Sequence, residues 1–170
     1  MKWKDFYIAG DDGVLNITAT KSGIDKNKLN TDCGIIPYIT RTDKNNGIDN
    51  FITANQSTKY KQDDGNVITI GLDTQTVFYQ PYNFYTGQNI QVLSNNKNLN
   101  KYVSLFICVM LQKQLKKFNW GGNGATIGRL KRTKMILPIN AFDKPDYGFM
   151  QQYAKMLIVQ KLLTYTEMQI

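Results

Sequence analysis

Histidine is absent from this 170-residue sequence, and cysteine occurs only twice, at Cys33 and Cys108. The absence of histidine excludes Ser–His–Asp and Cys–His catalysis and every metal site that uses histidine ligands. Two cysteines are also too few for a zinc site built from thiolates alone. In a cytosolic chain we expect two such cysteines to be buried thiols, while a disulfide between them stays open.

Acidic groups suited to catalysis are scarce as well. Glutamate occurs once, at Glu167, which leaves few candidates for general acid–base chemistry. The aspartate pairs Asp11-Asp12 and Asp63-Asp64 each precede a glycine in a turn-like sequence. A metal-dependent nuclease needs carboxylates that converge on a divalent ion. Nuclease activity therefore stays an alternative that depends on how these acids are arranged.

Long apolar runs are missing too. No run approaches the roughly 20 residues that a membrane-spanning helix needs, and residues 1–5, MKWKD, do not resemble a signal peptide. We therefore expect a soluble cytoplasmic protein that makes no membrane contact. A hydrophobic content of 42% over 170 residues is typical of one domain with a buried core and room for an appended element.

Positive charge exceeds negative charge and is unevenly placed. The sequence has 21 Lys and Arg against 13 Asp and Glu, a formal net charge of +8. A basic chain of this size often binds a polyanion such as nucleic acid. Residues 101–134 contain no acid and eight basic residues: Lys101, Lys113, Lys116, Lys117, Arg129, Lys131, Arg132 and Lys134. This stretch is either an ordinary solvated face or part of a polyanion-binding surface.

Short β-type runs follow the first 30 residues, which are mixed and carry turn signals at 11–13 and 22–23. Residues 43–47, DKNNG, and 63–66, DDGN, are strong turn signals because Asn and Gly tolerate positive φ. The runs predict strands over 34–40, 48–52, 67–71, 76–80, 90–93 and 135–139.

Two segments have helical spacing instead. Over 100–118 the apolar residues, Val109 among them, predict a largely buried helix with Asn100 as its N-cap. A second helix is predicted from Asp146, which can cap it. Its apolar residues pack either on another subunit or back on the same domain, and both arrangements stay open; they are Phe149, Met150, Tyr153, Leu157, Ile158 and Leu162. The whole pattern predicts an α+β fold.

A glycine-rich loop lies at 119–126, NWGGNGAT. It lacks the Gly-Lys-Ser/Thr ending of a phosphate-binding loop and the strand–glycine–helix order of a dinucleotide site. The alternatives are a turn that brings backbone N–H groups close to a phosphate, or a turn with a purely structural role.

Side chains suited to reading DNA are interleaved with these elements. Arg and Lys can read guanine and Asn and Gln can read adenine in the major groove, while hydroxyls, lysines and backbone amides hold phosphates. We assign base or groove reading to Arg41, Asn45, Asn46, Gln80, Tyr82 and Tyr85, and phosphate contact to Lys59, Lys61, Arg129, Lys131 and Arg132. Thr42, Trp120 and Asn123 complete the set of candidate DNA-binding residues.

Several phrases, in order, resemble the DNA specificity (S) subunits of type I restriction–modification systems and their relatives that pair with type II enzymes. The phrases are PYITRT at 37–42, NNGI at 45–48, ITIG at 68–71, FYQ at 78–80, TGQNI at 86–90, GAT at 124–126, LK at 130–131 and ILPI at 136–139. They span roughly residues 34–139.

The resemblance implies a target recognition domain, with a twisted β-rich core and a buried helix, over residues 1–140. Residues 141–170 would then form a linker and the start of a C-terminal spacer or dimerisation helix. Such a chain directs a methyltransferase subunit, and in some systems a restriction subunit, to double-stranded DNA. It has no catalytic centre or metal, because S-adenosylmethionine, Mg²⁺ and ATP act on the partner subunits. The phosphate and base contacts above rest on side-chain chemistry, since base-reading positions vary with the DNA target.

Two features differ from the family pattern. A full S subunit usually has two recognition domains and two spacer helices, whereas 170 residues hold one of each. Pairing with a second recognition domain, or a homodimer, would complete it. The proline-rich segment that usually introduces the spacer helix is replaced by AFDKPD at 141–146. The alternative function is therefore an interaction fragment that binds a methyltransferase subunit through its C-terminal helix and reads DNA poorly.

Overall fold

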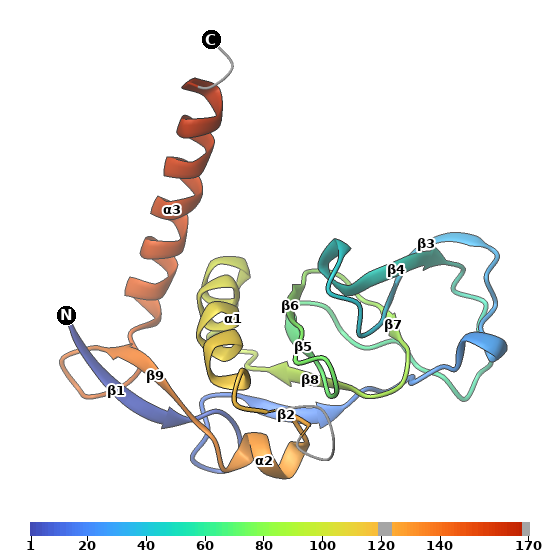
Figure 1. Ribbon diagram of the computed structural model, residues 1–170, viewed down its shortest axis with the longest axis horizontal. Helices are drawn as coiled ribbons and strands as arrows, with labels where there is room; N and C mark the ends of the chain where they lie inside the picture. The colour runs from blue at the N-terminus through green and yellow to red at the C-terminus, as the bar shows by residue number, and fades with distance from the viewer. Residues whose placement is uncertain (119–123, 168–170) are drawn as a thin grey trace.

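The computed structural model describes residues 1–118 and 124–167 (Figure 1). Strands and helices alternate irregularly along the chain, as predicted for an α+β fold. The strands are β1 (Lys2–Tyr7), β2 (Asn16–Ala19), β3 (Cys33–Ile39), β4 (Ile48–Ile52), β5 (Val67–Gly71), β6 (Val77–Gln80), β7 (Tyr85–Thr86), β8 (Ile90–Ser94) and β9 (Lys134–Ile139). The helices are α1 (Lys101–Leu115), α2 (Ile127–Lys131) and α3 (Tyr147–Glu167), with short 3-10 turns η1 (Lys26–Lys28) and η2 (Asn45–Gly47).

The main core lies between a four-stranded antiparallel sheet, of order β2-β8-β5-β6, and α1. β5 is buried along its whole length. Its β-branched residues suit a strand that is covered on both faces. Apolar side chains from β9 and α2, and Met150 of α3, join the same core. The core thus connects segments from both ends of the chain.

A second, smaller sheet has the order β4-β3-β7 and a core of its own. Ile24, Tyr38, Ile52 and Tyr85 form that core. The buried Tyr38 hydroxyl donates a 2.7 Å hydrogen bond to the Ile24 carbonyl oxygen. Burial raises the pKa of Tyr38 to about 12. Figure 1 shows this sheet at the end of the molecule away from α3.

A third pairing joins the first strand to the last. β1 runs antiparallel to β9, with Lys2 opposite Ile139 and Tyr7 opposite Lys134. The six strands predicted from the sequence are present with shifts of one residue at most, whereas β1, β2, β7 and α2 were not predicted.

The helix α1 matches its prediction at the N-terminus and differs in its buried face. The Asn100 side chain accepts hydrogen bonds from the backbone N–H groups of Tyr102 and Val103, so it is the N-cap. The buried residues include Val103, Phe106, Ile107, Leu111 and Leu115. Val109 is 50% exposed and lines an apolar cavity together with residues of α3. The expectation of a largely buried helix is correct for one face only.

The cysteine prediction is half confirmed. Cys108 is buried in α1, and burial raises the pKa of its thiol to about 12. Cys33 is exposed at the start of β3, so the expectation of a buried thiol is wrong there. Both thiols are free, which contradicts the disulfide alternative.

α3 starts on the domain and then leaves it. Asp146 caps it, since the Phe149 N–H donates to Asp146 Oδ1 at 2.9 Å. Met150 and Ala154 are buried against the body of the molecule, whereas Val159, Leu162 and Leu163 are each more than half exposed. Figure 1 shows the C-terminal part of α3 projecting away from every other element.

Candidate nucleic-acid interface

The turn between β5 and β6 is closed by backbone hydrogen bonds. The Gly71 N–H donates to the Thr76 carbonyl oxygen at 2.9 Å, and the Gln75 N–H donates to the Gly71 carbonyl oxygen at 2.9 Å. A Cβ on Gly71 would lie 2.5 Å from Thr76 Oγ1 and 2.6 Å from Thr74 Oγ1, so any larger residue here would force these side chains to move. The Leu72 N–H donates to the Asn89 carbonyl oxygen at 2.9 Å, which joins the turn to the loop after β7.

This turn carries Asp73, and Asp73 holds Arg41. An Arg41 Nη1 group donates to Asp73 Oδ2, and the Asn89 Nδ2 group donates to the same oxygen at 3.3 Å. The Arg41 side chain is 43% exposed and that of Asp73 is 27% exposed. The Arg41 guanidinium is therefore held by Asp73 and still accessible to solvent. Sequence reasoning proposed Arg41 but missed Asp73 as its partner, because 32 residues separate them.

The segment before α2 lies against the same turn. The Ala125 N–H donates to the Leu72 carbonyl oxygen at 3.0 Å, and a Cβ on Gly124 would lie 2.8 Å from that oxygen. The Arg129 Nη1 group donates to the Gly124 carbonyl oxygen at 3.1 Å. Lys131 and Arg132 follow as exposed side chains. The β5–β6 turn thus contacts Arg41 through Asp73, and through Leu72 it contacts the segment that leads into the predicted phosphate contacts.

The loop after β3 adds two exposed asparagines. Asn45 and Asn46 have φ of 48° and 57°, as the predicted turn requires. Asn46 Nδ2 donates to the Tyr79 carbonyl oxygen at 2.9 Å, which fixes the loop against β6. Thr42 is half-buried in the same loop. We use the name loop surface for residues 40–47, 72–76, 87–89 and 124–132.

Two predicted base readers are buried. Gln80 is 2% exposed, and its Nε2 donates to the Asn46 carbonyl oxygen and to Thr69 Oγ1, each at 3.1 Å. Tyr85 is 5% exposed, and its hydroxyl donates to the Ala54 carbonyl oxygen at 3.3 Å. Their polar groups are used inside the fold, so their role is to position loops. The base-reading prediction for these two residues is corrected accordingly.

The remaining candidates lie elsewhere or outside the described residues. Lys59, Lys61 and Tyr82 are exposed, and Tyr82 is 75% exposed. Their two segments meet near the bridge between Asp63 and Phe84, beyond the Gln80 end of β6. Trp120 and Asn123 fall outside the described residues, as does most of the glycine-rich loop.

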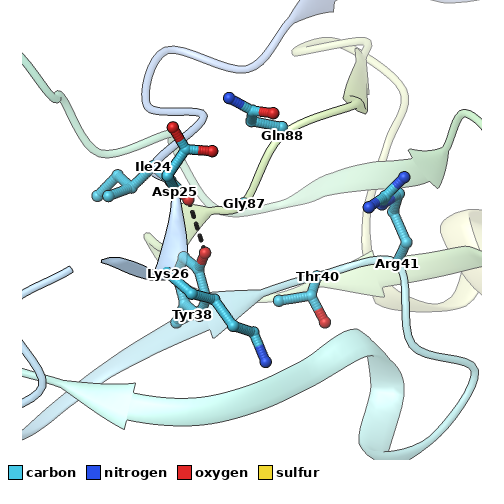
Figure 2. Close-up of a pocket in the computed structure, with 8 residues that line it drawn as sticks. All are labelled: Ile24, Asp25, Lys26, Tyr38, Thr40, Arg41, Gly87 and Gln88. Carbon is cyan, nitrogen blue, oxygen red and sulfur yellow. Dashed lines mark hydrogen bonds between the residues drawn. The ribbon is translucent and has the colours of Figure 1, made fainter. Parts of the chain in front are cut away.

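A pocket of about 200 Å³ with a mixed polar and apolar lining adjoins the loop surface. Its lining residues come from the η1 segment, from β3 and from the loop after β7; they are Ile24, Asp25, Lys26, Tyr38, Thr40, Arg41, Gly87 and Gln88. Figure 2 shows Asp25 and Lys26 on one side of this pocket and Arg41 on the other. Next to Arg41, the loop surface is therefore concave and carries side chains that can form hydrogen bonds.

The aspartates do not form a metal centre in the described parts of the chain. Within residues 1–118 and 124–167, no group of three or more Cys, Asp or Glu side chains could hold a metal ion. Asp63 is buried and accepts hydrogen bonds from Thr20 Oγ1 at 2.6 Å and from the Lys21 N–H at 3.0 Å. Burial raises its pKa, and these hydrogen bonds oppose the rise. Asp63 therefore ties two loops together.

An apolar surface lies where α1 meets β1 and α3. A cavity of about 330 Å³ is lined mainly by apolar side chains, among them Trp3, Val109, Phe149, Tyr153 and Leu157. Of the predicted partner-binding residues, Leu157 and Leu162 are exposed at 45% and 61%. Met150 is fully buried within its own chain, so its assignment to a partner interface is wrong. Phe149 and Ile158 are half-buried, and Tyr153 is 39% exposed.

In the described parts of the chain, no helix is long and apolar enough to cross a bilayer.

Comparison with known proteins gives one consistent result. A family model described as the type I restriction modification DNA specificity domain matches residues 2–164. The specificity subunit S.BcgI of a type II restriction enzyme from Heyndrickxia coagulans is 32% identical over 170 residues, covering 88% of this chain and 48% of that protein. The chain thus spans about half the length of this curated relative.

Solved structures show the same fold. The S subunit of a type I restriction–modification system from M. genitalium superposes with a TM-score of 0.65 at 15% identity, over 93% of this chain and 38% of that one. The HsdS subunit from Thermoanaerobacter tengcongensis gives a TM-score of 0.61 at 14% identity, over 99% of this chain and 40% of that one. The α+β fold with a C-terminal helix is therefore the fold of these subunits.

Proposed function

Because this chain belongs to the type I restriction modification DNA specificity domain family, we propose that it recognises a short sequence in double-stranded DNA. The observation that carries the proposal is that one turn, between β5 and β6, contacts Arg41 through Asp73 and also contacts, through Leu72, the segment that leads into the basic residues 129–132. Exposed Lys and Arg side chains supply salt-dependent affinity for phosphates, and a fixed Arg supplies base contact. The net charge of +8 favours the same partner.

We assign recognition to residues 1–140 and partner binding to residues 141–170. Two features support the division. Pairing of β1 with β9 closes the first part into one body that ends at Ile139. α3 then exposes apolar residues along its projecting half, which a partner can cover.

The partner is a methyltransferase subunit of a restriction–modification system, joined in some systems by a restriction subunit. The chain has no catalytic role of its own, and S-adenosylmethionine, Mg²⁺ and ATP act on the partner subunits. A second recognition domain, in another copy of this chain or in a longer polypeptide, reads the other half of the DNA site.

Selection from a randomised duplex library, with the purified chain at fixed salt, tests the recognition proposal. We expect enrichment of one motif of a few base pairs. A chain with Lys131→Ala and Arg132→Ala should enrich the same motif with lower affinity. Binding that leaves the library unchanged would contradict sequence recognition.

A second candidate is an interaction fragment that binds a methyltransferase subunit and reads DNA poorly. The exposed apolar residues of α3 favour it. It predicts an unchanged library together with a stable complex between the chain and a methyltransferase subunit, lost on Leu157→Asp with Leu162→Asp. A Thr164→Asp variant, on the same helix, is the matched control.

A further inference from the structure

Arg41 is held in a way that an ordinary surface arginine is not. Its partner Asp73 sits on the closed turn 71–76 and is itself bonded by Asn89. Asn89 comes from a third segment and has a φ of 62°. Asp73 therefore holds the guanidinium directly and Asn89 holds Asp73, although the Arg41 side chain remains 43% exposed.

We infer that Arg41 reads a guanine in the major groove and that Asp73 and Asn89 hold its guanidinium in place for that contact. The inference rests on the proposed function, and it names the base and the positioning residues. Of the three arginines in the chain, Arg129 and Arg132 belong to the 124–132 segment, so Arg41 is the one arginine that the other loops of the loop surface offer for bidentate guanine reading.

The hydrogen-bond count supports this role. A guanidinium has five N–H donors in a planar fork, and only one of them is used by Asp73 in the described structure. The remaining donors include an adjacent pair. Guanine presents O6 and N7 as two acceptors in the major groove, and a bidentate Arg satisfies both. Fixing the side chain beforehand removes the entropy cost of ordering it on binding.

Removal of the Asp73 carboxylate should have opposite effects on non-specific affinity and on the preference for guanine. A carboxylate near DNA repels phosphates, so its removal should strengthen non-specific binding. If Asp73 positions Arg41, its removal should at the same time weaken discrimination for guanine. If the Arg41–Asp73 ion pair has no such role, its removal should change neither the preferred base nor the ratio of affinities between that base and the others.

The first experiment uses base analogues. After selection has given the motif, each guanine in turn is replaced by 7-deazaguanine, which lacks the N7 acceptor. We expect one position at which the unmodified chain loses affinity by about 10- to 100-fold. At that position Arg41→Ala should already have lost the same affinity, so the analogue should cost this variant nothing further.

The second experiment uses substitutions that keep side-chain size. Asp73→Asn should reduce the preference for guanine at that one position, while affinity for random duplex stays the same or rises. Asp32→Asn, at an exposed side chain away from Arg41, removes the same charge and should leave the preference unchanged. Arg41→Lys should keep the salt dependence and lose the preference, because Lys is a point charge without a fork.

The outcomes separate the two proposals. A library that stays unselected overturns the proposed function, and the inference falls with it. A motif whose guanines are insensitive to Arg41→Ala overturns the inference and leaves the function standing. Equal weakening on all sequences makes Arg41 a phosphate contact, which also overturns it. Folding of each variant is verified by its thermal unfolding curve.

Discussion

Met150 is the residue whose removal best tests how α3 is attached. It is fully buried, in the same core as Phe106 and Leu137, where the first turns of α3 meet α1. Met150→Ala deletes a buried thioether chain and leaves a cavity, for which we expect a loss of about 2–5 kcal/mol in the free energy of unfolding. Helix propensity does not contribute to this loss, because Ala is a better helix former than Met.

The assay is thermal or urea unfolding of paired variants. In a chain of this length, a loss of about 3 kcal/mol lowers Tm by roughly 6–12 °C. Met156→Ala is the matched control, since it makes the same chemical change on the same helix at a side chain that is 45% exposed. We expect the control to stay within about 0.5 kcal/mol. Equal shifts for the two variants would refute the assignment of Met150 to the core and of Met156 to a free face.

Three further predictions concern charge, pH and thiol chemistry. Lys131→Ala and Arg132→Ala should each lower the slope of log K against log salt by about one unit, measured by fluorescence anisotropy on a DNA duplex; an unchanged slope would remove that residue from the phosphate contacts. Because the folded pKa of Asp63 is raised, its contribution to stability is fully present below pH 3.8 and is lost as pH rises through the folded pKa. The urea midpoint of the unmodified chain minus that of Asp63→Asn should therefore fall with rising pH, and a rise would contradict the burial effect. A thiol reagent should label Cys33 in the native state and reach Cys108, whose pKa is about 12, only after denaturation; native labelling of both thiols would contradict the described burial.

Local signals in the sequence were enough for the central strands and both long helices. The turns at 43–47 and 63–66 carry Asn residues that adopt positive φ, and Asn100 and Asp146 cap their helices as predicted. β1 was missed because its partner β9 lies at the other end of the chain, and no local pattern reports that pairing. Its exposed, charge-rich sequence KWKDFY also hides the alternation expected of a strand.

The candidate site was predictable in chemistry but only partly in position. Gln80 and Tyr85 have the right side chains for reading bases, yet they serve as internal hydrogen-bond partners. Polar residues in short strands have the same composition whether they face solvent or core, so sequence alone cannot separate the two cases. The Arg41–Asp73 pair depends on the register of β5 with β6 and on where the loop after β3 returns, which are tertiary properties.

The pairing of β1 with β9 has a consequence for the order of folding during synthesis. β1 leaves the ribosome long before β9, its only described strand partner, is completed at Ile139. β5, β6 and β8 are close in sequence, so they can pair with one another and pack against α1 while β1 is still unpaired. Until then the edge of β1 is open to pairing with other chains. A chain that stops before residue 134 should therefore aggregate, whereas one that stops after Ile139 should close.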